Sequence, residues 1–131
     1  MPNAILVEIA PGELLDKQSI LEIKAERILD PEKRANVTTE LEILRKARLE
    51  NLGEDGALTA LYDRLKAVNE RLWDIEDAIR DEERASRFGD RFVELARSVY
   101  RSNDERAAIK REINLTLGSR IVEEKSYARY E

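Results

Sequence analysis

The feature that most constrains the fold is an unbroken pattern of apolar residues in the middle of the chain. Between Ala57 and Ser86 these residues are separated by steps of 3, 4, 3, 4, 3 and 4: Leu58, Leu61, Leu65, Val68, Leu72, Ile75 and Ile79. This spacing places all of them on one face of an α-helix. A helix of about thirty residues is roughly 45 Å long, far longer than the average helix of a globular domain. We therefore expect long helical hairpins that bury their extra length in a homo-oligomer.

Residues that start and stop helices define two helices before this one. The stretch PGELLDKQSILEIKAERIL predicts a first helix over residues 11–29, with Pro11 in its first turn. Asp30 is a candidate N-cap and Pro31 suits the first position of a second helix, which should run to about Leu52. The turn GEDG then separates this helix from the heptad-patterned one.

A fourth helix is predicted from about Asp90 to Leu117, with Gly118 as its C-terminal stop. The expected fold class is therefore mainly α, a bundle of two long helical hairpins. A length of 131 residues suits a single helical domain over residues 1–131.

Two short stretches outside the helices have strand-like composition. AILVEIA, at residues 4–10, contains Val and two Ile in a short run and predicts an N-terminal strand. The tail SRIVEEKSYARY, at residues 119–130, is a candidate for a second short strand beside the first.

Composition removes several classes of chemistry. The chain has no cysteine and no histidine, so thiolate catalysis, a Ser-His-Asp site and a typical zinc site are excluded. A net charge of −5 and a sequence pI near 5.0 argue against general nucleic-acid binding. No apolar run approaches the roughly 20 residues of a transmembrane helix, and no signal peptide is visible. We expect a cytoplasmic protein that binds neither membrane nor nucleic acid.

The fourth helix contains the most informative irregularity. Its apolar positions keep the helical spacing, but Ser102 and Arg106 stand where apolar residues are expected. A buried arginine is costly unless it is paired and fully hydrogen-bonded. Either this layer of the bundle is polar, or the helix breaks and restarts near Ser102, where Ser102 and Glu105 match a capping box.

Polar residues on three helices support the first alternative. Asn69, Trp73, Glu76 and Arg80 form one stripe, Lys17 and Lys24 interrupt an apolar face, and Asn103 and Lys110 flank Arg106. Facing stripes of this kind would build a cationic pocket with a tryptophan wall, which suits an anionic ligand with a planar group. The predicted ligand-binding residues are Lys17, Lys24, Asn69, Trp73, Glu76, Arg80, Tyr100, Asn103, Arg106 and Lys110.

The same residues also have a purely structural interpretation. Lys and Arg often lie half-buried with their aliphatic stems packed and their charges in water. Glu76 and Arg80 are four residues apart and match an exposed helical ion pair.

A second set of residues indicates different chemistry. Glu70, Asp74, Asp77 and Asp81 lie at steps of 4, 3 and 4 on one helix face. With Glu22 or Glu26 from another helix, such carboxylates could hold Mg²⁺ for water activation, as in helical nucleotide hydrolases. The alternative is a solvated acidic face neutralised by neighbouring arginines.

Three stretches carry a resemblance to a known family: PGELLDKQSILEIKAERI, VNERLWDIEDAIR and RFVELARSVYRSNDERAAIKREINLTLGSRIVEEKSY. Together they resemble an uncharacterised bacterial domain-of-unknown-function family of about this length, and the first also resembles small phage-encoded proteins. The resemblance transfers no catalytic residues. Its bacterial members imply a setting near surface-polysaccharide genes, whereas its phage relatives imply a sponge for nucleotide immune signals in anti-phage defence.

The leading hypothesis is therefore a helical homo-oligomer that binds an anionic, nucleotide-type small molecule, without catalysis, metal or cofactor. The first alternative is a Mg²⁺-dependent nucleotide hydrolase that uses Glu70, Asp74 and Asp77. The second alternative is a structural or adaptor bundle linked to surface-polysaccharide synthesis, in which the polar layer only sets register and oligomeric state.

Overall fold

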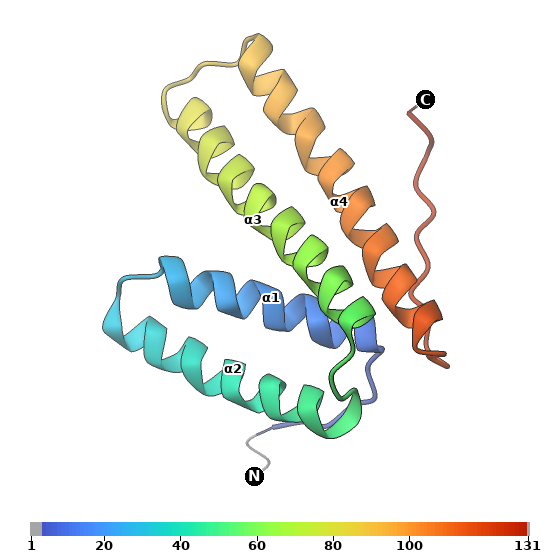
Figure 1. Ribbon diagram of the computed structural model, residues 1–131. Coiled ribbons are helices and arrows are strands. Elements are labelled where there is room, and N and C mark those ends of the chain that lie inside the picture. The colour runs from blue at the N-terminus through green and yellow to red at the C-terminus, as the bar shows by residue number, and fades with distance from the viewer. Residues whose placement is uncertain (1–3, 131) are drawn as a thin grey trace.

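The computed structural model describes residues 4–130, which form four α-helices arranged as two hairpins (Figure 1). The first hairpin consists of α1 (Pro11–Arg27) and α2 (Pro31–Asn51). The second consists of the longer α3 (Gly56–Arg84) and α4 (Asp90–Thr116). The predicted helical bundle of two hairpins is confirmed, with helix ends within two residues of those expected from the sequence.

The helix starts follow from local hydrogen bonding. The Asp30 carboxylate accepts a hydrogen bond from the Lys33 backbone N–H (2.9 Å), and Asp55 accepts one from Ala57 (2.7 Å). Each bond satisfies an N–H that lacks a partner inside the helix. Gly118 has a φ of +65°, the left-handed conformation that ends α4 at the predicted residue.

Helix α1 is the central element, because it packs against each of the other three helices, whereas α2 packs against α1 alone. The main core lies where α1 crosses the first half of α3 and the second half of α4. It contains Leu15, Leu58, Leu61, Tyr62, Leu65, Val68, Ile109 and Ile113. A smaller cluster between α1 and α2 contains Leu21, Val37 and Leu41. The heptad-patterned face of α3 is thus the core face, as predicted.

The strand prediction is wrong for the described part of the chain, since residues 4–130 contain no strand. Residues 4–10 are extended and leave the bundle at its base, and the C-terminal segment (residues 119–130) turns back along α4 (Figure 1). The two extended segments therefore run apart, with Arg120 and Glu8 as a salt bridge near their origin. Because the two segments do not pair with each other, no sheet forms between them.

Helix α4 is continuous from Asp90 to Thr116, so it does not break near Ser102. The polar layer is therefore a real feature of the bundle. None of the four described helices is both long enough and apolar enough to cross a membrane.

Candidate functional site

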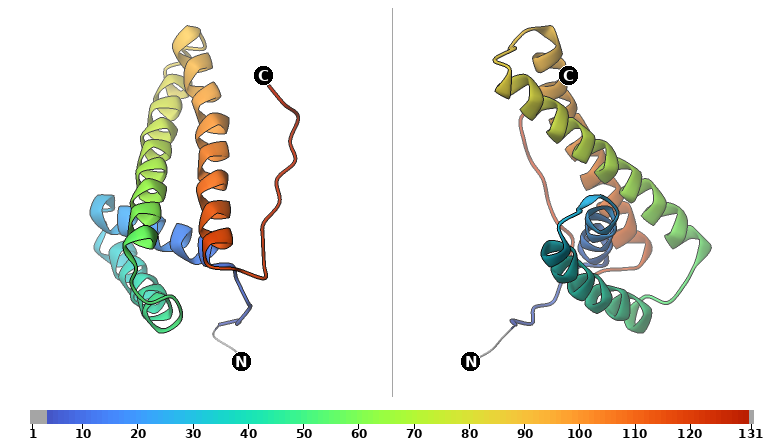
Figure 2. Two further views of the ribbon diagram at one scale, coloured as in Figure 1. Left: turned by 45° about the vertical axis from the view of Figure 1, so that its right-hand side comes forward. Right: turned by 90° about the vertical axis from the view of Figure 1, so that its left-hand side faces the viewer.

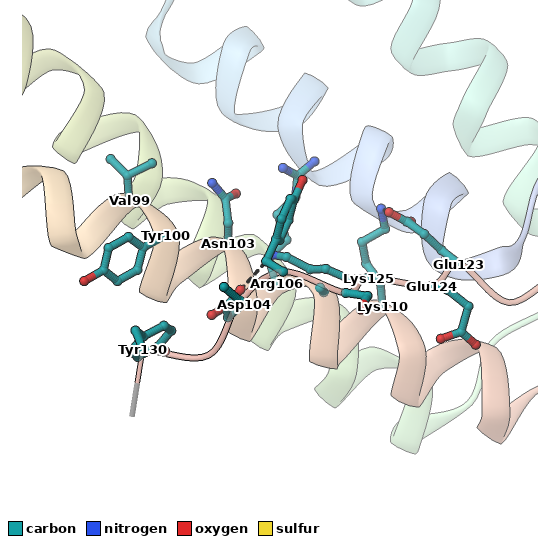
Figure 3. Close-up of a pocket in the computed structure, with 14 residues that line it drawn as sticks. Val99, Tyr100, Asn103, Asp104, Arg106, Lys110, Glu123, Glu124, Lys125 and Tyr130 are labelled. Carbon is teal, nitrogen blue, oxygen red and sulfur yellow. Dashed lines mark hydrogen bonds and ion pairs between the residues drawn. The ribbon is translucent and has the colours of Figure 1, made fainter.

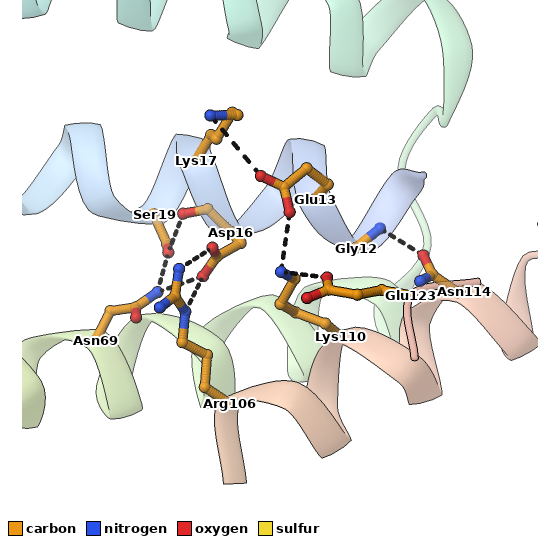
Figure 4. A network of polar contacts seen from close by, with 10 residues as sticks. All are labelled: Gly12, Glu13, Asp16, Lys17, Ser19, Asn69, Arg106, Lys110, Asn114 and Glu123. Carbon is orange, nitrogen blue, oxygen red and sulfur yellow. Dashed lines mark hydrogen bonds and ion pairs between the residues drawn. The ribbon is translucent and has the colours of Figure 1, made fainter. Parts of the chain in front are cut away.

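A buried polar network lies where α1, α3 and α4 meet (Figure 4). Its centre is Asp16 on α1, which is only 1% exposed. Arg106 on α4 donates from Nε to Asp16 Oδ1 (2.9 Å) and from a terminal nitrogen to the other carboxylate oxygen. Asn69 on α3 donates to Asp16 Oδ1 (2.9 Å) and to Ser19 Oγ (2.8 Å). Both oxygens of the carboxylate thus accept hydrogen bonds. A buried charge is tolerated only when it is paired and hydrogen-bonded in this way.

This pairing also fixes the charge and the position of Arg106. The hydrogen bond to Asp16 raises the pKa of the guanidinium above its ordinary value, although burial opposes the shift. The side chain remains 30% exposed. Arg106 is thus held by two parallel hydrogen bonds, and part of its surface still faces outward.

The N-terminus of α1 is locked against α4 one turn away from this network. The backbone N–H of Gly12 donates to Asn114 Oδ1 (2.7 Å), and Asn114 is only 1% exposed. A Cβ added at Gly12 would lie 2.6 Å from the carbonyl oxygen of Lys110. Only glycine permits this approach of two helix backbones.

Lys110 lies between the network and the C-terminal segment. Its ammonium group donates to Glu13 on α1 (2.9 Å) and to Glu123 (2.8 Å), and its side chain is 10% exposed. Burial lowers the pKa of Lys110, but the hydrogen bonds to Glu123 and Glu13 outweigh this and raise it above its ordinary value. Lys110 is therefore cationic at neutral pH and shared between two carboxylates.

The candidate site is a groove of about 750 Å³ between α4 and the C-terminal segment, which we call the α4 groove (Figure 3). Tyr100, Asn103, Arg106 and Lys110 line it from α4, and all four are predicted ligand-binding residues. The opposite wall adds Lys125, Tyr127 and Tyr130. Tyr100 and Tyr130 stand with their ring centres 5.0 Å apart. The lining also includes the carboxylates of Asp104, Glu123 and Glu124, which pair with Lys125, Lys110 and Arg111. The groove therefore combines paired cations, aromatic rings and an amide within reach of one small molecule.

The other predicted residues lie outside the α4 groove. Asn69 belongs to the buried network behind Arg106. Half-buried Trp73 lies beside Arg27, whose guanidinium carbon is 5.8 Å from the ring centre.

The remaining predicted residues lie on α3 and α1. Glu76 and Arg80 form a salt bridge with each other on α3. Lys17 lies 3.7 Å from Glu13, and Lys24 is half-buried on α1. The stripe on α3 thus reaches the polar layer only at Asn69.

The acidic residues of the alternative hydrolase lie on α3 beside the end of α1. Asp74 accepts a hydrogen bond from Arg27 at 2.6 Å. Across residues 4–130, no group of three or more Asp, Glu, His or Cys side chains is placed to hold a metal ion.

Sequence reasoning missed Asp16, the central residue of the network. Gly12, Asp16, Ser19 and Ile23 follow one another at steps of 4, 3 and 4 on α1, and all four are buried. This heptad spacing of small and polar residues could have predicted a polar layer on α1. The tyrosines of the C-terminal segment carried no such signal, because their contacts depend on how the chain turns after α4.

Comparison with known proteins leaves the function open. No curated protein and no solved structure shows significant similarity to the chain. A family of unknown function, DUF6165, matches residues 5–130, which include all four helices, the polar network and the α4 groove. The chain belongs to the DUF6165 family.

Proposed function

We propose that this protein binds an anionic small molecule with a planar group, of the nucleotide type, in the α4 groove, without converting it. The observation that carries the proposal is the composition of the groove. Arg106, Lys110 and Lys125 line the same hollow as Tyr100, Tyr127 and Tyr130. Cations recognise phosphate, and aromatic rings stack on planar groups.

Pre-organisation of Arg106 supports this assignment. The guanidinium is held by Asp16, which itself is held by Asn69, so the cation is fixed before any ligand arrives. A fixed side chain loses little conformational entropy on binding. In this account the buried network positions the binding residue and does not itself contact the ligand.

Size is also consistent with this ligand class. A volume of about 750 Å³ falls in the range of pockets for small organic molecules, about 300–1,000 Å³. The α4 groove is open along one side, so a ligand larger than a single nucleotide can extend beyond it.

Mass spectrometry of small molecules released from the protein after purification from its natural host tests the proposal. We expect an anionic compound to be released by heat and recovered unchanged. Tyr100→Ala should abolish its retention, whereas Phe88→Ala, a matched exposed aromatic at the end of the α3–α4 hairpin, should retain it. Recovery of no compound from the wild-type protein contradicts the proposal. A compound converted by the protein with Mg²⁺ supports the hydrolase instead.

A second candidate function, a homo-oligomeric adaptor, is favoured by a different observation. Ile5, Leu6 and Val7 in the N-terminal segment are 85%, 94% and 73% exposed. Consecutive exposed aliphatic residues are typical of surfaces that are covered by another chain. Analytical ultracentrifugation of the wild type and of a triple variant, Ile5→Ser, Leu6→Ser and Val7→Ser, tests this function. An oligomer that the variant dissociates supports it, and a monomeric wild type contradicts it.

A further inference from the structure

The C-terminal segment runs back along α4, and ion pairs with that helix set its position. After Gly118 the chain reverses direction, fixed by a hydrogen bond from the Ser119 N–H to the Asn114 carbonyl (2.8 Å). It then runs back alongside α4 in both further views (Figure 2). Its contacts with α4 determine which functional groups of the helix a ligand can reach.

These contacts are complementary in charge. Glu123 accepts from Lys110 at 2.8 Å, and the adjacent Glu124 accepts from the adjacent Arg111 at 3.1 Å. The next residue, Lys125, pairs with Asp104 at 2.8 Å. Two neighbouring carboxylates of the segment therefore neutralise two neighbouring cations of α4.

The segment rests on side chains and does not pack closely on the helix. The α4 groove lies on one side of it, and a second hollow of about 820 Å³, lined by Arg111, lies on the other. The Glu124 side chain is 77% exposed, and Tyr127 is 82% exposed. Segments held by exposed ionic contacts open locally at low cost compared with a packed helix.

We propose that Glu123 and Glu124 act as an intramolecular mimic of the ligand's anionic groups. In this proposal, which rests on the proposed function, the ligand carries two adjacent anionic groups of the diphosphate class. These groups replace the two carboxylates on Lys110 and Arg111, so residues 121–124 move away from these cations, whereas Lys125, Tyr127 and Tyr130 keep their places on the α4 groove. The segment thus competes with the ligand and lowers its apparent affinity.

The test uses the full-length chain, with inorganic pyrophosphate as the probe at constant ionic strength. The variant Glu123→Gln/Glu124→Gln removes both competing charges. The control variant Glu40→Gln/Glu42→Gln makes the same charge change on exposed positions of α2. Calorimetry gives the affinity, and amide spectra of the ¹⁵N-labelled proteins report the order of residues 121–130.

We expect pyrophosphate to bind the Glu123→Gln/Glu124→Gln variant about threefold or more tightly than the wild type, and the control variant like the wild type. Saturation of the wild type should shift the amide signals of residues 121–124 toward those of an unstructured chain, whereas those of residues 125–130 should not shift in that direction. If pyrophosphate binds the wild type but binds the Glu123→Gln/Glu124→Gln variant equally or more weakly, the proposal that the carboxylates mimic the ligand is overturned. The proposed binding function then stands.

Absence of pyrophosphate binding in all three proteins overturns the diphosphate class. The binding function is judged separately by the small molecules released from the host-purified protein. If only the Glu123→Gln/Glu124→Gln variant loses pyrophosphate binding, these carboxylates belong to the binding site. That result also overturns the proposal that they mimic the ligand.

Discussion

Arg106 and Asp16, ninety residues apart in the sequence, form a two-pronged ion pair that joins α4 to α1. The pair couples the two hairpins at the position where α1 crosses the second one. Asn69 donates to the Asp16 carboxylate and to Ser19 Oγ, and Ser19 Oγ donates to the Asp16 backbone carbonyl. The carboxylate is therefore held from α3 as well as from α4. The same pair positions the cation that faces the α4 groove.

Removal of the Asp16 charge should destabilise the fold. Asp16→Ala leaves the half-buried Arg106 without its partner, and loss of one member of a buried pair costs about 3 kcal/mol of the free energy of unfolding. Urea unfolding followed by circular dichroism measures this cost. Asp77→Ala, an exposed acidic residue on α3, is the control and should stay within about 0.5 kcal/mol of the wild type.

The paired substitution Asp16→Leu/Arg106→Leu should recover much of that loss, because neither charge is then left unpaired. Arg106→Leu alone leaves Asp16 buried and charged, so it should destabilise the fold as Asp16→Ala does. Unfolding free energies of the two single leucine variants and the double variant provide the measurement. Strict additivity of the two single effects would contradict the coupling.

Gly12→Ala should also destabilise the protein. The new Cβ would lie 2.6 Å from the Lys110 carbonyl oxygen and 2.9 Å from Asn114 Oδ1, so α1 must move away from α4. We expect a loss of about 1–3 kcal/mol, measured by thermal or urea unfolding. Gly56→Ala is the matched control, because nothing lies within 4 Å of a Cβ there. A Gly12→Ala variant as stable as Gly56→Ala would show that the helices do not approach this closely.

The C-terminal segment should detach from α4 in acid. Hydrogen bonds from Lys125 and Tyr130 lower the pKa of Asp104 below its ordinary value of 3.8. A carboxyl with a lowered folded-state pKa contributes stability above its unfolded pKa, and this is lost as the pH falls through the folded value. Amide spectra should therefore show residues 121–130 ordered at neutral pH and released below about pH 3.8.

A substitution separates Asp104 from the other carboxylates that hold the segment. Asp104→Asn removes the charge that Lys125 pairs with, so it should loosen the same residues at neutral pH. Glu105→Gln, next to Asp104 but paired with Arg71 on α3, is the control. Unchanged amide signals in Asp104→Asn would show that this contact does not hold the segment.

The sequence predicted the fold well where local rules decide the structure. The heptad spacing of α3, the cap at Asp30 and the stop at Gly118 depend on neighbouring residues along the chain. The N-terminal strand was predicted wrongly, because a strand requires a partner, and composition does not say where the partner runs. The tail instead turns along α4 under the control of long-range ion pairs.

The candidate site was predictable only in part. Arg106 stood out as a charge in an apolar pattern, and the structure confirms the polar layer that this irregularity predicted. Its partner Asp16 lay on another helix, and the pairing depends on how α1 crosses α4. Trp73 was placed by its helix stripe, but the register of α3 against α1 sets it beside Arg27 and away from the α4 groove.

Calorimetric titration of the wild-type protein tests the central claim most directly. The titrants are nucleoside diphosphates, cyclic dinucleotides, ADP-ribose derivatives and nucleotide sugars. The account predicts saturable heat with at least one of them, lost in Tyr100→Ala and retained in Phe88→Ala. No heat with any titrant would contradict the assignment of the α4 groove as a site for anionic, nucleotide-type ligands.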